Sequence, residues 1–195
     1  MNSKEFSNLH QKEEKPNLAA VILAGGRGTR MGTPNKHKCS FEIDGEPSIY
    51  RLLDTLRENE ISTNVLVVGA LSEQIMNLVG KRYKDVIYAF QSKQKGTGNA
   101  AKHGICPLKS AGFEGNIFIL AGDAYIEPDS LKRLLEKFRS EGADMALLTK
   151  KKSDNPRAGH IIKNEKGNVV ASIEFWDIRK ALAAKRWKNR LPILF

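Results

Sequence analysis

The stretch LAAVILAGGRGTRMGTPNKHKCSFEIDG, residues 18–45, decides the fold of this chain. Its apolar run stops at Gly25 and Gly26, which predicts a buried strand whose carboxyl end leads into a glycine-rich turn. No helical apolar stripe follows before Pro47, and an irregular loop of that length inside a compact domain usually has a function. The loop carries four cations, Arg27, Arg30, Lys36 and Lys38. Because glycines let backbone N–H groups approach an anion whose charge the cations offset, the stretch predicts a triphosphate-binding site.

Spacing excludes two better-known phosphate loops. The dinucleotide fingerprint G-x-G-x-x-G has two residues between its last two glycines and opens a helix. Here three residues separate Gly28 from Gly32, and no helical pattern follows. A Walker A loop closes with Gly-Lys-Ser or Gly-Lys-Thr, and no such tripeptide closes this loop. The loop therefore belongs to neither of these classes.

After this loop, apolar strand-like runs alternate with stretches of helical spacing. Further strands are predicted at residues 64–69, 85–90, 116–120 and 143–149. Helices are predicted within residues 48–59, 71–83, 96–108 and 131–142. Pro47 is expected in the first turn of the first helix, Ser72 or a neighbour as the cap of the second, and Met76 on its inward face. The alternation predicts a three-layer, doubly wound, mostly parallel α/β sheet.

The chain beyond Lys150 has a different pattern. A polar loop is followed by a predicted β-hairpin over residues 159–175 that turns at residues 166–168. Residues 177–190 have the composition of a basic helix.

Composition narrows the class of protein. The chain has 195 residues, 41% hydrophobic and 28% charged, which suits one domain with a substantial core. Cys39 and Cys106 lie far apart without metal-ligand spacing, so we expect a reduced cytoplasmic protein without zinc. The longest apolar runs, about seven residues, are too short to span a bilayer, and the N-terminus lacks the apolar segment of a signal peptide. We therefore expect no membrane partner.

The net charge of +10 comes largely from the end of the chain. Residues 176–195 hold six basic residues and one acidic residue, so this segment carries half of the net positive charge. The remainder is mildly basic, and no recognisable nucleic-acid module occurs. These observations favour anionic nucleotides over nucleic acid as the partner.

Residues 23–31, LAGGRGTRM, resemble position for position the signature of sugar-1-phosphate nucleotidyltransferases, in particular the N-acetylglucosamine-1-phosphate uridylyltransferase-like pyrophosphorylase domain. The resemblance implies a Rossmann-like nucleotidyltransferase fold with a small β-hairpin part that binds the sugar. It also implies that Arg30 and Lys38 stabilise charge at the transferring phosphorus. Counting back from Gly45 puts the family lysine at Lys38, and Lys36 is the second choice. The nucleotide-binding residues implied here are Leu23, Ala24, Gly25, Gly26, Gly28 and Thr29.

Three later segments extend the resemblance. Gln91 followed by Gly96 and Thr97 is similar to the family's base-reading pattern, and a side-chain amide suits this role because it both donates and accepts hydrogen bonds. Asp123, just past an apolar strand, matches the family's aspartate for Mg²⁺, whose preferred ligands are hard oxygens. Gly159 and Glu174 match positions that bind the sugar.

The resemblance ends near residue 178. The expected nucleotidyltransferase domain therefore spans residues 18–178, with a basic tail at 179–195. Residues 1–17 alternate in charge without an apolar segment and are expected to be a disordered tail. Family members continue further and supply a second metal carboxylate there. We therefore expect a C-terminally truncated domain, whose site a protein partner or a missing segment would complete.

The implied reaction joins a nucleoside triphosphate to a sugar 1-phosphate and releases pyrophosphate. Two alternatives stay open: a nucleotide-binding remnant or regulatory subunit that transfers nothing, and a cytidylyl- or guanylyltransferase acting on a non-sugar phosphate. The base, the sugar and the oligomeric state are not determined by the sequence.

Overall fold

The computed structural model describes residues 17–26, 35–149 and 159–173. The chain divides into two compact units, residues 1–146 and residues 147–195. Among the described residues, no helix is both long and apolar enough to cross a membrane.

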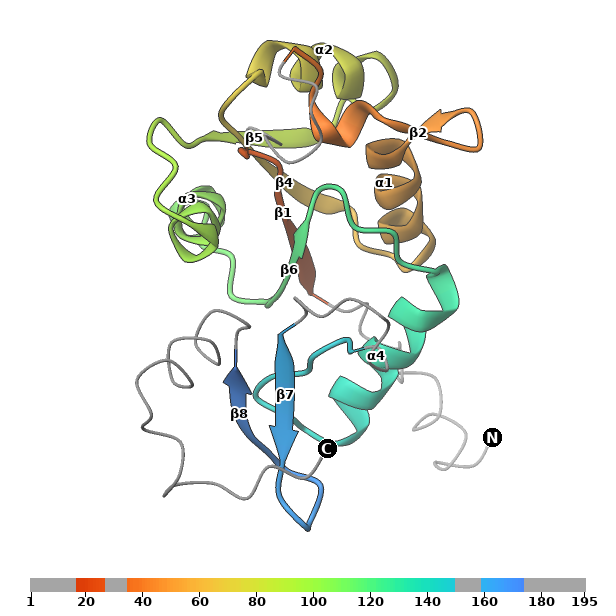
Figure 1. The fold of residues 1–195 in the computed structure, drawn as a ribbon, viewed down its shortest axis with the longest axis vertical. Coiled ribbons are helices and arrows are strands. Elements are labelled where there is room, and N and C mark those ends of the chain that lie inside the picture. The colour runs from red at the N-terminus through yellow and green to blue at the C-terminus, as the bar shows by residue number, and fades with distance from the viewer. Residues whose placement is uncertain (1–16, 27–34, 150–158, 174–195) are drawn as a thin grey trace, which may run out of the picture. The chain divides into compact units, whose positions relative to one another are not determined.

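The first unit is built on a parallel sheet of four strands in the order β5-β4-β1-β6 (Figure 1). These strands are β1 (Leu18–Leu23), β4 (Thr63–Val68), β5 (Val86–Phe90) and β6 (Asn116–Ala121). Each neighbouring pair is parallel. Strand β1 is central because its run of apolar residues can be buried on both faces of the sheet.

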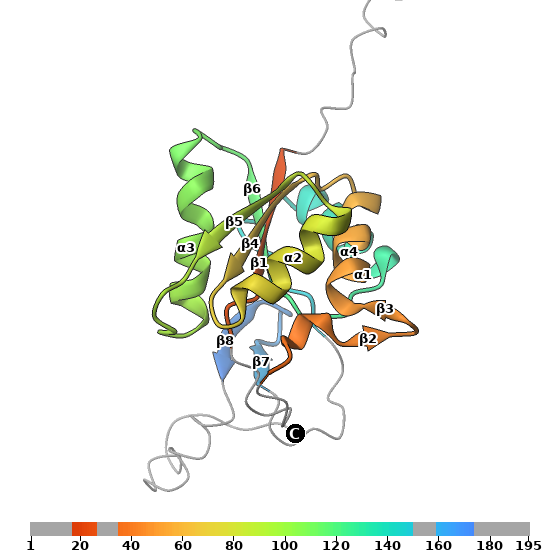
Figure 2. The ribbon, with the colours of Figure 1, turned by 90° about the horizontal axis from the view of Figure 1, so that it is seen from above.

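Helices cover both faces of this sheet (Figure 2). One face packs against α1 (Ser48–Glu58), α2 (Ser72–Arg82) and α4 (Pro128–Ser140), and the other face packs against α3 (Thr97–Ser110). Successive strand residues point to opposite faces, so Ala20 and Ile22 join the first core and Ala19 and Val21 join the second. The predicted three-layer, doubly wound α/β fold is confirmed.

The loop that follows β1 contains short regular elements. A single 3₁₀ turn, η2 (Lys38–Ser40), leads into a two-strand hairpin of β2 (Glu42–Ile43) and β3 (Glu46–Pro47). Asp44 and Gly45 join these strands with φ angles of +51° and +80°, as a type I′ turn requires and as the Asp-Gly dipeptide allows.

Several local predictions are wrong. Residues 143–149 form no strand, because an apolar run becomes a strand only where a neighbouring backbone pairs with it. Pro47 occupies the N-cap position, just before the first turn of α1, and not a position within that turn. In α2, Ser72 is the first helical residue and offers no side-chain cap. Met76 is exposed, since Ile75 and Val79 already form the buried stripe of that helix.

The second unit contains the predicted hairpin. Strands β7 (His160–Lys163) and β8 (Val169–Ile173) pair antiparallel. The turn is closed by the Asn164 side chain, whose Oδ1 accepts from the backbone N–H groups of Lys166 and Asn168. Residues 177–190, where a basic helix is expected, lie outside the described residues.

Candidate active site

The predicted site residues of the first unit follow the carboxyl ends of the sheet's strands. Parallel strands all end at one edge, where open α/β sheets bind their ligands. Backbone hydrogen bonds continue across this edge: Gly122 N–H donates to Leu23 O at 2.9 Å, and Gln91 N–H donates to Val68 O at 2.8 Å. The residues that follow β1, β5 and β6 are therefore held together, although they are far apart in the sequence.

Lys38 and Asp123 form an ion pair at this edge. Lys38 Nζ lies 2.8 Å from Asp123 Oδ1 and donates to it. The Lys38 stem lies close to Gly26, where an added Cβ would be 3.9 Å from Lys38 Cε. The Lys36 ammonium instead lies 4.7 Å from the centre of the Phe41 ring. The structure thus brings Lys38, and not Lys36, to the predicted metal-binding carboxylate.

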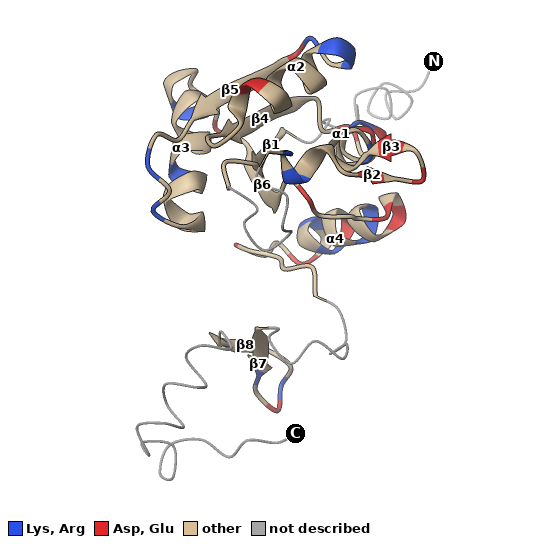
Figure 3. Ribbon diagram, turned by 45° about the horizontal axis from the view of Figure 1, so that its top comes forward, with Lys and Arg blue, Asp and Glu red and all other residues tan. Residues whose placement is uncertain are grey.

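The ion pair contributes little to the stability of the fold. The Lys38 and Asp123 side chains are 19% and 42% exposed, and pairs of this kind typically contribute about 0–1 kcal/mol. Figure 3 shows basic residues in blue and acidic residues in red on the ribbon, with both signs along α4. The fold therefore gains little from this pair, and both groups stay accessible to solvent.

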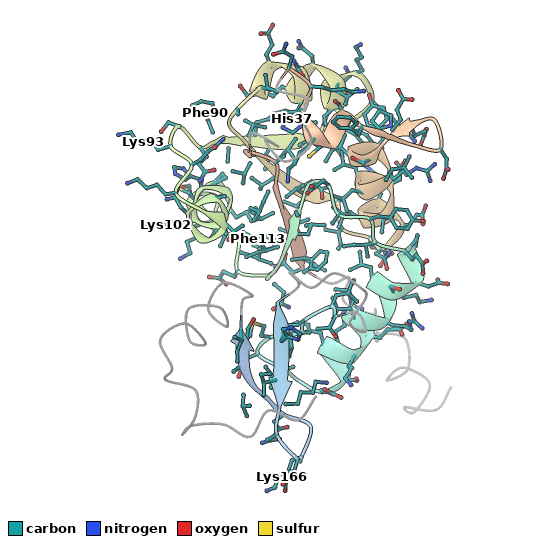
Figure 4. All side chains as sticks on the ribbon, in the orientation of Figure 1. His37, Phe90, Lys93, Lys102, Phe113 and Lys166 are labelled. Carbon is teal, nitrogen blue, oxygen red and sulfur yellow. The ribbon has the colours of Figure 1, made fainter. Side chains whose placement is uncertain are left out.

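His37, next to Lys38, is buried and bonded through both ring nitrogens. Its Nε2 lies 2.8 Å from Ala24 O, and its Nδ1 lies 3.2 Å from the backbone nitrogen of Cys39. A carbonyl can only accept and an amide N–H can only donate, so the ring is neutral with its proton on Nε2. His37 therefore links the chain after β1 to η2 (Figure 4).

Burial controls the titration of both neighbours of Lys38. Desolvation lowers the pKa of His37 below its usual value, and the Lys38 charge lowers it further, against the opposing influences of the Ala24 bond and of Asp123. Desolvation raises the pKa of the Cys39 thiol to about 12. Both side chains are consequently neutral near pH 7.

Acid should destabilise the first unit through His37. The unfolded chain binds a proton on this imidazole below about pH 6.5, whereas the folded chain resists protonation to lower pH. The contribution of neutral His37 to the free energy of unfolding is therefore complete above pH 6.5, and it is lost as the pH falls toward the folded-state pKa of His37. We expect chemical denaturation to show a fall in unfolding free energy across this window, and a smaller fall in His37→Gln. Equal falls in both proteins would contradict the assignment.

Amide side chains surround the glycine turn on the side of β5. Gln91 is 4% exposed, and its Nε2 donates to Asn99 Oδ1 at 2.9 Å. Gln94 Nε2 donates to Gly25 O at 2.7 Å. Gly96, with a φ of +94°, directs the chain into α3, whose first residue is Thr97. The predicted base-reading segment and the predicted phosphate turn are thus in direct contact.

Close backbone approach also explains Gly69. A Cβ at this position would lie 2.8 Å from Gly25 O and 3.2 Å from Gln91 O. Gly69→Ala should therefore push the glycine turn out of place and lower the unfolding free energy by about 1–3 kcal/mol, as overpacking does. Gly80→Ala is the matched control, because a Cβ there meets nothing within 4 Å. Urea denaturation measures both, and equal stability of the two variants would contradict the expectation.

The chain matches the model of the MobA-like NTP transferase domain over residues 20–185. This chain belongs to that family. The match covers the parallel sheet apart from the first two residues of β1, its helices and every described residue of the site.

The chain is also similar to curated proteins over most of its own length. The bifunctional protein GlmU of Neisseria meningitidis serogroup C is 35% identical over 173 residues, 88% of this chain and 36% of its own length. GlmU of Geotalea uraniireducens is 36% identical over 167 residues, 85% of this chain and 35% of its own length. The chain therefore spans about a third of the length of these relatives.

Solved structures share the NTP transferase fold. HddC from Yersinia pseudotuberculosis, solved with GMP-PN, is 25% identical with a TM-score of 0.60, and the match covers 80% of this chain and 68% of HddC. The UDP-glucose pyrophosphorylase from Acinetobacter baumanii is 20% identical with a TM-score of 0.51, covering 64% of this chain and 53% of that one. The second likeness bears on the fold alone.

The donor set at the site suits Mg²⁺ within an NTP transferase. Within residues 17–26, 35–149 and 159–173, no three His, Cys, Asp or Glu side chains form a metal-binding group. Mg²⁺ does not need one, because it commonly takes one or two carboxylates and completes its coordination with water and substrate phosphates. Asp123, accessible at the strand edge, is the residue that would hold it.

Some predicted residues are not placed at this site. Gly28, Thr29, Arg30 and Glu174 lie outside the described residues. Gly159 directly precedes β7 in the second unit. Their expected roles stay predictions.

Sequence reasoning missed the residues that hold the site together. His37, Gln74 and Gln94 carry no motif, and each acts through a hydrogen bond to a residue distant in the sequence. Asn99, which binds Gln91 from the first turn of α3, was also missed. The one sequence signal was the position of His37 between two lysines, and that position does not indicate that the imidazole is buried.

Proposed function

We propose that this chain transfers a nucleotidyl group from a nucleoside triphosphate to a sugar 1-phosphate. A phosphate oxygen of the sugar 1-phosphate attacks the α-phosphorus, the new P–O bond forms, and the bond to the β-phosphate breaks so that pyrophosphate leaves. The observation that carries the proposal is the 2.8 Å contact between Lys38 Nζ and Asp123 Oδ1 beside the glycine turn. Membership in the MobA-like NTP transferase family supports the use of a nucleoside triphosphate.

The chain's own groups would act by position and charge. The backbone of residues 23–26 would wrap the phosphates, and the Lys38 ammonium would offset the charge that builds up on the α-phosphate oxygens. Arg30 is proposed for the same task because a guanidinium fork binds pairs of oxygens. Fixed charges of this kind need no reorganisation during the reaction, so most of the rate acceleration would be electrostatic.

We propose Mg²⁺ as the metal and Asp123 as its ligand. When bound, the ion would neutralise part of the triphosphate charge and orient its oxygens. Before the triphosphate arrives, the charge of Asp123 is offset by Lys38, whose ammonium lies 2.8 Å away.

The base would lie against the amide cluster. Gln91 is held by Asn99, and its remaining donor and acceptor capacity could pair with the edge of a base. HddC was solved with GMP-PN, a guanine nucleotide, whereas the GlmU names give no base for this chain. Gly159 and Glu174 are proposed for the sugar, and the domain limits 18–178 and a cytoplasmic location remain predictions.

A pyrophosphate-release assay tests the proposal. Purified protein with Mg²⁺ is offered each of five nucleoside triphosphates in combination with a panel of sugar 1-phosphates, and triphosphate binding is measured in parallel. Release that requires both substrates supports the proposal. Tight binding without release in any combination would favour the nucleotide-binding remnant, and release with a phospho-alcohol alone would favour the non-sugar acceptor. Activity that appears only with an added partner protein would support an incomplete site.

A further inference from the structure

We propose that Gln74 is a positioning residue that sets the place of Lys38, an inference that rests on the proposed function. Gln74 lies in the first turn of α2, and its side chain contacts the backbone of the segment that leads to η2. Its Nε2 donates to Asn35 O at 2.8 Å, and its Oε1 accepts from the His37 N–H at 3.1 Å. One amide thus binds a donor and an acceptor of the same short segment.

This pair of bonds acts directly on Lys38. Asn35 and His37 come just before the lysine, and His37 is also bonded to Ala24 on the other side of the glycine loop. Lysine has a long, flexible stem, so its ammonium stays in one place only if the backbone that carries it is fixed. Gln74 holds that backbone from α2, and His37 holds it from β1.

The geometry of α2 supports a dedicated role for its first turn. Leu71, which precedes the helix, has a φ of +54° and gives α2 no side-chain cap. A left-handed conformation is unfavourable for a residue other than glycine, and such strain tends to occur at functional sites. The adjacent Ala70 N–H donates to Gly25 O at 3.3 Å. The connection from β4 to α2 therefore contacts one end of the glycine loop through Ala70, and Gln74 in α2 contacts the other end.

The contacts of Gln74 suit positioning better than stability. Gln74 is exposed, and its hydrogen bond to Asn35 is accessible to water. Loss of the side chain opens no cavity in the core, since Ile75 and Val79 form the buried stripe of α2. Its removal should consequently leave the fold intact and affect the site alone.

The test uses Gln74→Met, which keeps the length of the side chain and removes both hydrogen bonds. Gln74→Glu retains the acceptor for the His37 N–H and loses the donor to Asn35 O. Asn77→Met is the matched control, because Asn77 is exposed one turn later on the same helix. We expect kcat for pyrophosphate release to fall about threefold to tenfold in Gln74→Met, in keeping with the net effect of one or two hydrogen bonds. The KM for the triphosphate should change less, Gln74→Glu should be intermediate, and Asn77→Met should match the wild type.

A second readout does not depend on turnover. Competitive acylation followed by mass spectrometry measures how readily the Lys38 side-chain amine reacts in its neutral form, and we expect faster labelling in Gln74→Met than in Asn77→Met. Unchanged labelling, or faster labelling with unchanged kcat, would overturn the inference. If the wild type releases no pyrophosphate with any substrate, the proposed function fails, and the labelling of Lys38 still decides whether Gln74 positions it.

Discussion

Replacing Lys38 with alanine is expected to lower kcat for pyrophosphate release by about two to three orders of magnitude, the usual effect of removing one fixed charge or donor from a transition state. Lys38 is the cation that contacts Asp123 at the strand edge. Lys36→Ala is the matched control. Its ammonium lies over the Phe41 ring, so we expect a change of less than about threefold. Steady-state assays of both variants under saturating substrate measure the difference.

The comparison of the two lysines also tests the alignment of the loop. Equal losses in Lys36→Ala and Lys38→Ala would show that the ion pair does not identify the catalytic cation. A Lys38→Ala variant with normal kcat and weakened triphosphate binding would assign the lysine to ground-state binding instead. Thermal denaturation should show little change in either variant, because the pair is accessible to water.

Asp123→Asn is expected to lower turnover by about three orders of magnitude and to abolish its dependence on Mg²⁺ concentration. The amide keeps the shape of the carboxylate and can still accept from Lys38, but it brings no negative charge to a metal. Asp129→Asn serves as the control, because Asp129 is exposed in the first turn of α4. Initial rates over a magnesium titration, with the melting temperature as a check on folding, give the answer.

If the initial rate of Asp123→Asn still depends on the Mg²⁺ concentration, the metal must be bound by other residues. If both aspartate variants lose activity together with their melting temperature, the effect is one of stability. These outcomes distinguish a metal ligand from a structural carboxylate.

The sequence was informative wherever the chemistry is local. The apolar run of β1 and the glycines that follow it predicted the centre of the sheet and the edge at which the site lies. The separation of strands by helices predicted the parallel arrangement. The Asp-Gly dipeptide at residues 44–45 is also typical of the type I′ turn that joins β2 and β3, in a segment predicted to be an irregular loop.

The sequence was uninformative wherever a residue acts through a distant partner. Nothing in the spacing of Gln74 shows that its amide reaches back 39 residues to Asn35. The strand predicted at residues 143–149 failed for a related reason, since its apolar pattern could not reveal whether a neighbouring backbone would pair with it. Pairing is a property of the folded chain and not of the segment.

The contrast between the two cysteines offers a practical handle. Cys39 is buried beside Lys38 with a raised pKa, whereas Cys106 is exposed on α3. The thiolate is the reactive form, so a maleimide dye should attach to Cys106 and leave Cys39 untouched. The natural chain thus provides one attachment point for a fluorophore, on the helix whose first turn carries Asn99, and ligand titrations can be followed optically without engineering a cysteine-free background.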